Sequence, residues 1–205
     1  MILGYQTSRK PRLDSNFLQN KDDLELYCKG DEISLSNAGF YQVYRGVVQL
    51  YRVSEDQQET VVGWVTANHA FGNSLNDSGR NHKAIALSDV YLRYYEPAQV
   101  KRNPRLARLL VSELAYRLLK SEQMVVIHQV RRVEDRLKAL LQMLKGDLGI
   151  SLNYDQSVRL TARFTHQNLA DAICTTRVTI TRILGEWHRN DLIEFDCDRH
   201  LIIKF

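Results

Sequence analysis

Short apolar runs separated by turn-forming residues fill the first half of the 205-residue chain. The runs are rich in valine and tyrosine, which favour strands, and turn residues lie between them, as at Lys29-Gly30-Asp31. The predicted strands cover residues 24–28, 40–43, 47–53, 60–65, 83–87 and 90–95. The pattern predicts a compact antiparallel domain after a loosely ordered lead-in over residues 1–20. We expect a small ligand, if there is one, at the longest irregular stretch, 71–80.

The apolar period becomes helical after Pro104 and stays helical to about Gly146, with a break at 129–132. Proline at this place is typical of a helix start. From Ala107 onward a stripe with alternating spacings of four and three residues passes through Val111, Leu114, Leu118, Ser121, Val125 and His128. Such a stripe either packs on the chain's own β domain or forms a two-stranded coiled coil between identical subunits. We expect the coiled coil, with Ser121 and His128 as polar register positions rather than haem or metal ligands.

Residues 165–189 predict two short helices joined by a tight turn. Thr165 is a good N-cap for the first helix and Thr176 for the second, and Cys174 and Thr175 interrupt the pattern between them. The apolar positions at core spacing are Leu169, Ala170 and Ile173 in the first helix and Ile180, Ile183, Leu184 and Trp187 in the second. The small Ala170 lets the two helices approach closely, as in a helix-turn-helix.

The outer face of the second helix carries side chains suited to reading DNA. Arg177 can reach a guanine O6/N7 pair, Val178 can contact a thymine methyl group, and Thr181 and Arg182 lie one turn further on. The threonines at the helix starts, with the helix N-terminus, can hold phosphate. The predicted DNA-binding residues are Thr165, Thr175, Thr176, Arg177, Val178, Thr181, Arg182 and Arg199. Taken alone, the segment also fits an ordinary helical hairpin with a solvated Thr/Arg face.

The surroundings of this helix pair favour DNA binding. Two alternating strands follow within 192–204 around a tight turn at 196–199, and another short strand, 158–160, precedes the pair. Strand, helix, turn, helix and hairpin is the order of a winged helix. Arg199 and His200 then lie near the tip of the wing, where they can contact the DNA backbone.

The composition is that of an ordinary globular protein, with 44% apolar and 25% charged residues. The three cysteines, at 28, 174 and 197, form no CxxC pair, which favours a cytoplasmic protein without a disulfide framework or bound metal. No apolar run reaches the roughly 20 residues that span a bilayer, so we expect no membrane partner. The net charge of +4 comes from the second half of the chain, which suits a polyanion. We expect no enzyme, because no nucleophile–base pair, paired carboxylates, metal-ligand spacing or phosphate loop is present.

From about Leu24 to Phe205 the order and spacing of these features resemble the Crp/Fnr family. The matching residues are Lys29-Gly30-Asp31, Tyr41, Gly46, Val48, Leu50 and Phe71-Gly72, followed by the long helix and the winged motif. The resemblance implies an α+β fold: a cyclic-nucleotide-binding-like β-roll over 1–102, a long dimerisation helix over 103–130 and a C-terminal winged helix-turn-helix over 131–205. It also implies a homodimeric, sequence-specific transcription regulator whose partners are double-stranded DNA and RNA polymerase.

Within that family, residues 176–182 are similar to the recognition helix of the NtcA-type nitrogen regulators of cyanobacteria. Valine, here Val178, stands where the cyclic-AMP receptor has glutamate. The similarity implies a palindromic target of the GTA-N8-TAC kind.

The resemblance is weaker at the residues that would bind an effector. Asn73 stands where cyclic-nucleotide members have the glutamate of a Phe-Gly-Glu run, and His82-Lys83 replace their Arg-Ser pair, so cyclic AMP is not expected. Three scattered cysteines cannot supply the ligands of an iron–sulfur cluster.

The similarity to NtcA-type regulators instead implies 2-oxoglutarate, a dianion that two arginines can bind. The implied effector-binding residues are Phe71, Gly72, Asn73, Ser74, Arg80, Arg117, Ser121 and Glu122. Two alternatives remain open. In an effector-independent regulator, Arg80 is solvent-exposed while Arg117 and Glu122 support the dimer helix. In a ligand-binding module, the helix-turn-helix contacts protein rather than DNA.

Overall fold

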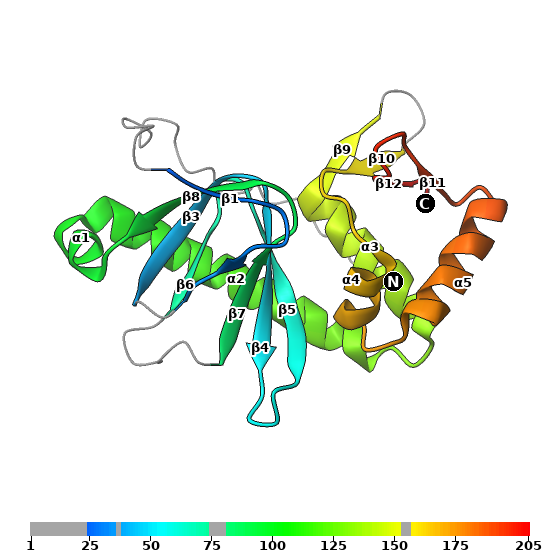
Figure 1. Cartoon of the computed structure of the whole chain (residues 1–205), viewed down its shortest axis with the longest axis horizontal. Helices are drawn as coiled ribbons and strands as arrows, with labels where there is room; N and C mark the ends of the chain where they lie inside the picture. The colour runs from blue at the N-terminus through cyan, green and yellow to red at the C-terminus, as the bar shows by residue number, and fades with distance from the viewer. Residues whose placement is uncertain (1–23, 36–37, 74–80, 153–156) are drawn as a thin grey trace, which may run out of the picture.

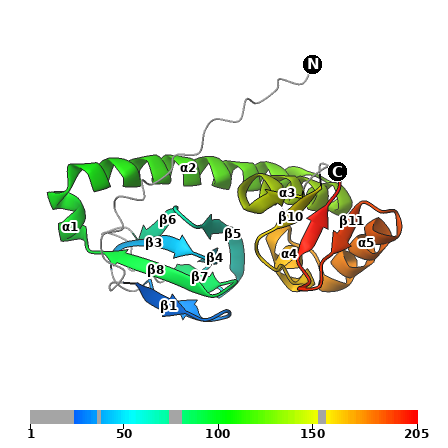
Figure 2. The same ribbon diagram turned by 90° about the horizontal axis from the view of Figure 1, so that it is seen from above.

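The computed structural model describes residues 24–35, 38–73, 81–152 and 157–205. A β-roll and a C-terminal helical unit lie side by side, and the long helix α2 runs along both of them (Figure 1; Figure 2). The lead-in expected at 1–20, the residues 74–80 of the expected ligand loop, and with them Ser74 and Arg80, lie outside the described residues.

The β-roll consists of two four-stranded antiparallel sheets, in the orders β1-β8-β3-β6 and β2-β7-β4-β5. The strands are β1 (Glu25–Tyr27), β2 (Glu32–Ile33), β3 (Gly39–Arg45), β4 (Val47–Val53), β5 (Glu59–Thr66), β6 (Ala70–Asn73), β7 (His82–Ala86) and β8 (Val90–Tyr95). The inward side chains of both sheets, such as Val43, Val48 and Leu92, form one apolar core. The tight β3–β4 turn requires Gly46, which has φ +97° and whose added Cβ would lie 2.4 Å from the Asp89 carbonyl oxygen.

All six predicted strands are present, with ends that differ by at most two residues. The expectation of an irregular stretch beginning at residue 71 was wrong for its first three residues. They belong to β6, which pairs with β3 so that Phe71 lies opposite Tyr41. Neither β2 nor the short helix α1 (Pro97–Arg102) was predicted.

The long helix predicted after Pro104 is α2 (Pro104–Gln129). Asn103 caps it, because its Oδ1 accepts from the backbone N–H of Arg105 and of Leu106, each at 3.1 Å. The helix stops at the predicted break and α3 (Val133–Leu148) follows. One face of α2 packs on the protein, with Leu106, Leu110, Met124 and Ile127 buried.

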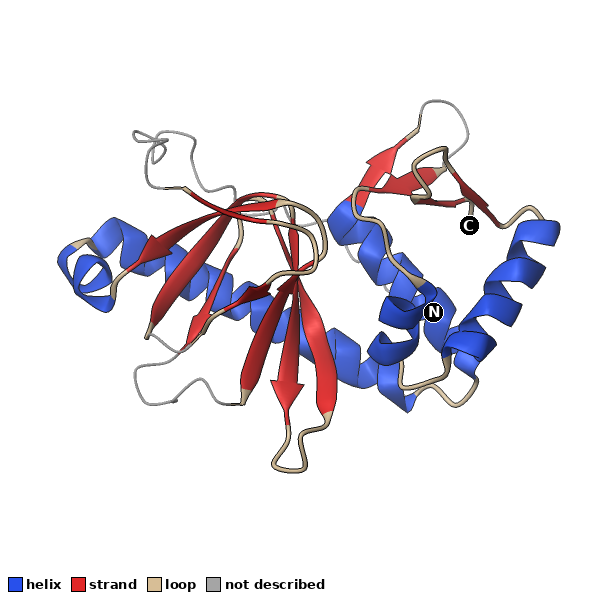
Figure 3. Cartoon of the chain, viewed as in Figure 1, coloured by secondary structure: helices blue, strands red, loops and turns tan. Residues whose placement is uncertain are grey.

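The C-terminal unit packs α3 and two shorter helices against a small sheet, an arrangement that can be followed in Figure 3. Its further elements are β9 (Gly149–Ser151), β10 (Val158–Leu160), α4 (His166–Ala172), α5 (Arg177–Arg189), β11 (Ile193–Phe195) and β12 (Leu201–Ile203). The sheet has the order β11-β12-β10-β9. Leucines of α3 meet Leu169 of α4 and Ile180 of α5 in the core. Strand order and helix pair are those of the predicted winged helix-turn-helix, with β9 as an addition.

The two parts contact each other through the outer face of β4 and β5. Val47, Tyr51 and Val61 belong to the same apolar cluster as the helices α3, α4 and α5, and the Trp64 ring meets Phe164 edge-on at 5.7 Å between centroids. Gln49 lies on this face of β4, between Val47 and Tyr51. It is fully buried, and its amide atoms, like Trp64 Nε1, have no hydrogen-bond partner among the described residues.

A chain of polar contacts also joins the β-roll to α2 and α3. His69, between β5 and β6, bonds through Nδ1 to Glu113 Oε2 of α2 at 2.8 Å, and both side chains are buried. The Tyr116 ring stacks on His69 at 4.7 Å, and its hydroxyl donates to Asp147 of α3 at 3.0 Å. Lys120 completes the chain with an ion pair to Asp147 at 2.8 Å.

Candidate DNA interface

The two caps predicted for the helix pair are present. Thr165 Oγ1 accepts from Asn168 N at 3.1 Å, while Asn168 Oδ1 accepts from Thr165 N at 3.0 Å, which forms a capping box at the start of α4. Thr176 Oγ1 accepts from Thr179 N at 3.2 Å at the start of α5. Between the helices the chain turns at Cys174, whose φ is 53°. These local interactions fix where α5 begins and therefore which of its residues face outward.

The outer face of α5 is exposed as expected. Arg177, Thr181 and Arg182 are exposed, and Val178 is 78% exposed although it is apolar. The opposite face is buried through Ile180, Ile183, Leu184 and Trp187. The helix therefore presents a cationic and methyl-bearing surface that none of the described residues covers.

An open groove of about 680 Å³ lies beside this face, between the starts of α4 and α5 and the hairpin β11–β12. The described residues that line it are Arg163, Phe164, Thr165, His166, Gln167, Arg177, Phe195 and Arg199. Three of these are arginines and none is acidic, so the groove suits a polyanion. Sequence reasoning missed Arg163, His166 and Phe195. The position of His166, directly after the capping threonine, was the available signal, because a residue there lies at the exposed start of a helix.

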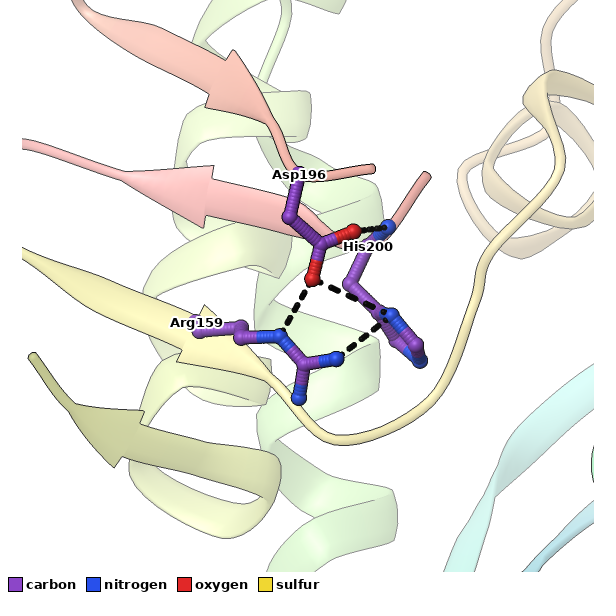
Figure 4. Close-up of polar contacts among 3 residues, drawn as sticks. All are labelled: Arg159, Asp196 and His200. Atoms are coloured by element: carbon purple, nitrogen blue, oxygen red, sulfur yellow. Dashed lines mark hydrogen bonds and ion pairs between the residues drawn. The ribbon is translucent and has the colours of Figure 1, made fainter. Parts of the chain in front are cut away.

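The turn of the hairpin is held by Arg159, Asp196 and His200 (Figure 4). Arg159 Nε donates to Asp196 Oδ2 at 2.5 Å, and the His200 backbone N–H donates to Asp196 Oδ1 at 2.7 Å. Partial burial by itself would raise the pKa of the Asp196 carboxyl, but these hydrogen bonds and the charge of Arg159 lower it to about 2. The ionised carboxylate thus braces the turn in which Arg199 adopts a φ of 60° and lines the groove.

The side chains of Asp196, Asp198 and His200 lie close together near this turn, but Arg159 makes them unsuitable for a metal ion. Ligand atoms of Asp196, Asp198 and His200 lie within 4.8 Å of one another. The guanidinium of Arg159 already contacts Asp196 and His200 there, and its positive charge disfavours a second cation.

A second exposed surface runs along α2. Val111, Leu114, Leu118 and Val125 of the predicted stripe are exposed, and Leu118 is 61% exposed. Leu119 and Val126, which were not predicted, widen this exposed apolar face.

Ser121 and His128 lie off the exposed face of α2. Ser121 is half-buried, and His128 Nε2 contacts the Ala172 carbonyl oxygen of the same chain at 2.8 Å. The reason is geometric: a heptad series on a straight α-helix drifts about 20° per heptad. Leu114, Ser121 and His128 are each seven residues apart. Because of the drift, Leu114 is exposed, Ser121 is half-buried and His128 faces α4 of the same chain.

Most of the described effector candidates lie apart from one another, and only Arg117 and Ser121 among them line a common hollow. Phe71 stacks on Tyr41 within the β-roll core at 5.4 Å, and an added Cβ at Gly72 would lie 2.2 Å from the Gly39 carbonyl oxygen. Both residues therefore have structural roles. Glu122 is exposed. Asn73 ends β6.

Arg117 and Ser121 do share a small hollow between β5, α2 and α3. Its volume of about 30 Å³ is room for about one water molecule. Burial lowers the pKa of the Arg117 guanidinium, and the charge of Glu113 partly opposes that shift. The charge of Arg117 is consistent with an anion site, but the space beside it in this conformation is far smaller than a dicarboxylate.

Comparisons with known proteins agree with this architecture. Residues 135–204 match the Crp-like helix-turn-helix domain family. The chain is 34% identical over 161 residues to the Global nitrogen regulator of Nostoc sp. strain PCC 7120, which covers 75% of this chain and 71% of that protein. The Global nitrogen regulator of Synechococcus elongatus is 33% identical over 162 residues, or 75% and 72% of the two chains.

Solved structures share the whole fold. FixK2 from Bradyrhizobium japonicum superposes with a TM-score of 0.73 at 19% identity, over 89% of this chain and 92% of that chain. A transcriptional regulator of the CRP/FNR family from Thermus thermophilus gives a TM-score of 0.67 at 23% identity, over 88% of this chain and 92% of that chain.

Fold and interface thus define a transcription regulator with a cyclic-nucleotide-binding-like β-roll and a winged helix-turn-helix. The chain belongs to the Crp/Fnr family, with a similarity to the nitrogen regulators that extends well beyond the recognition helix. The relatives found are regulators rather than enzymes. Among the described residues, no helix is both long and apolar enough to cross a membrane.

Proposed function

We propose that this chain is a homodimeric regulator that inserts α5 into the major groove of a GTA-N8-TAC-like palindrome. The observation that carries the proposal is the exposed face of α5, in which Arg177 and Arg182 flank the uncovered Val178 and Thr181. Arg177 would read guanine and Val178 a thymine methyl group. Thr165, Thr175, Thr176 and Arg199 would contact phosphates, which position the helix without reading sequence.

The exposed apolar face of α2 supports the homodimer. An apolar stripe on a helix of 26 residues is suited to pairing with an identical helix, and two subunits are needed to read both halves of a palindrome. Family membership also supports RNA polymerase as a further partner.

The second part of the proposal concerns effector control. The hollow beside Arg117 would have to widen before 2-oxoglutarate could enter, which favours effector-independent DNA binding in the conformation described. Binding measurements with and without 2-oxoglutarate separate these alternatives: unchanged DNA affinity is expected for an effector-independent regulator, and increased affinity for a controlled one.

A gel-shift assay tests the DNA-binding proposal. At one fixed salt concentration, the chain is expected to bind a GTA-N8-TAC duplex about 1,000-fold or more tightly than a scrambled duplex of the same length. Arg177→Ala is expected to weaken specific binding by about 1–3 kcal/mol and to leave weak binding to the scrambled duplex nearly unchanged. Arg102→Ala, which removes the same charge from the exposed end of α1, is the matched control. Equal affinity of the wild-type chain for both duplexes would refute sequence-specific recognition.

A further inference from the structure

His166, the first residue of α4, is held against the recognition helix by a defined hydrogen-bond arrangement. Its Nδ1 lies 2.8 Å from Thr181 Oγ1, and that hydroxyl donates to the Arg177 carbonyl oxygen at 2.9 Å. A threonine hydroxyl has one hydrogen, so Thr181 must accept from His166. The proton of the neutral His166 ring therefore resides on Nδ1.

With the proton on Nδ1, the other ring nitrogen, Nε2, is the atom that can contact a ligand in the groove. His166 lines the groove, and Nε2 has no hydrogen-bond partner among the described residues. In the neutral ring Nε2 carries a lone pair and can only accept a hydrogen bond. A phosphate oxygen also only accepts, so a neutral His166 would repel the ligand that the groove is suited to hold.

Among the described residues that line the groove around His166, every charged side chain is an arginine. Thr181 and Arg177 face it from α5, Arg163 from the segment before α4, and Arg199 with Phe195 from the hairpin. Burial lowers the pKa of His166 below its ordinary 6.5, and the charge of Arg177 lowers it further. In the absence of DNA, the ring is therefore mostly neutral at pH 7.

We propose that His166 takes up a proton when a DNA phosphate enters the groove, so that Nε2–H donates to the phosphate while Nδ1–H continues to hold Thr181. The proton comes from solvent and no covalent bond changes. The phosphate supplies the negative charge that the groove lacks, and so it favours the imidazolium. The inference rests on the proposed function and adds that DNA binding by this chain is coupled to protonation.

The direction of the pH dependence follows from linkage. The proposed complex binds the additional proton more tightly than the free protein does, so the pKa of His166 is higher in the complex. DNA affinity therefore falls as the pH rises through the window between the pKa of His166 in the free protein and its higher pKa in the complex. For one proton per subunit on each half-site, the affinity per half-site should fall by up to about tenfold per pH unit within that window. A second consequence concerns Thr181: with its hydroxyl committed to Arg177 and His166, its methyl group is the part left to contact a base.

Isothermal titration calorimetry of the full chain with the GTA-N8-TAC duplex measures the proton directly. Titrations at pH 7 in two buffers of different ionisation enthalpy are expected to show uptake approaching one proton per subunit. His166→Gln, whose amide can still donate to Thr181, should bind the duplex with uptake near zero and with affinity nearly constant from pH 6 to 8. His82→Gln, on β7 and bonded to Arg52, is the matched control and should keep the wild-type uptake.

The outcomes separate the inference from the proposed function. A wild-type chain that prefers the palindrome but takes up no protons overturns the inference alone, whereas a chain without preference overturns the proposed function. Uptake that survives His166→Gln but disappears in His200→Gln would assign the proton to the hairpin and also overturn the inference. If His166→Gln fails to fold, nitrogen-15 NMR of the wild-type imidazoles decides: the His166 ring must change from neutral to doubly protonated when the duplex is added at pH 7.

Discussion

Leu118→Glu is expected to lower the affinity for the palindromic duplex by about 100-fold or more. Leu118 lies in the middle of the exposed apolar face of α2, with Leu114 and Val125 on either side of it along the helix. In the proposed dimer the substitution places two carboxylates in an apolar seam, where burial and like-charge repulsion both oppose association. A monomer binds one half-site at a time and loses the high effective concentration of the second recognition helix.

Sedimentation velocity should report a monomer for Leu118→Glu at concentrations where the wild-type chain is a dimer, and gel shift should report the loss of affinity. Leu26→Glu is the matched control, because Leu26 is an exposed leucine on β1. It should change neither property. A Leu118→Glu chain that remains dimeric would show that subunits associate through another surface.

Glu113→Ala is expected to reduce the free energy of unfolding by about 1–3 kcal/mol, the typical cost of leaving a buried polar group without its hydrogen-bond partner. The substitution leaves the buried His69 ring without its partner and removes the acceptor that faces the Ala70 N–H at 3.4 Å. The loss of this partner also affects the Tyr116 ring indirectly, because that ring stacks on His69.

Urea denaturation followed by circular dichroism measures this loss. Glu113→Gln should lose less, because its amide oxygen can still accept a hydrogen bond. Glu55→Ala removes a carboxylate from an exposed turn and should change stability by less than about 0.5 kcal/mol. A Glu113→Ala chain as stable as the Glu55→Ala chain would show that the His69–Glu113 pair contributes nothing net.

The elements that could be predicted from the sequence are those fixed by local interactions. Thr165 and Thr176 cap α4 and α5 through backbone groups three residues away, so the limits of the helix pair follow from the residue types alone. The alternating runs of the β-roll carry a similar local signal. Strands β2 and β9 are only two and three residues long, and β6 exists because it pairs with the distant β3, so their signals are weak or non-local.

The sites depend more on tertiary packing and were predicted less completely. The outward side of α5 followed from its period, but the groove beside it forms only where α4 and the hairpin come together, which explains why Arg163 and His166 were missed. Phe71 was taken for an effector contact because of its neighbours in sequence, whereas its ring stacks on Tyr41, thirty residues earlier. The large apolar members of the α2 stripe are exposed, but the helical drift that turns Ser121 and His128 away from them appears only in three dimensions.

The buried contact between β5 and the C-terminal unit has an optical consequence. Of the two tryptophans in the chain, Trp187 lies in the core of the C-terminal unit and donates through Nε1 to Glu134 at 2.9 Å, while Trp64 lies against Phe164 and its N–H has no partner among the described residues. An unpartnered buried donor costs about 1–3 kcal/mol, and Gln49 beside it adds to that cost, so both groups gain hydrogen bonds to water when the two parts separate. Fluorescence from Trp64 is therefore expected to shift to longer wavelength on separation, so that in a Trp187→Phe background the emission reports whether the contact between the two parts is closed or open to solvent.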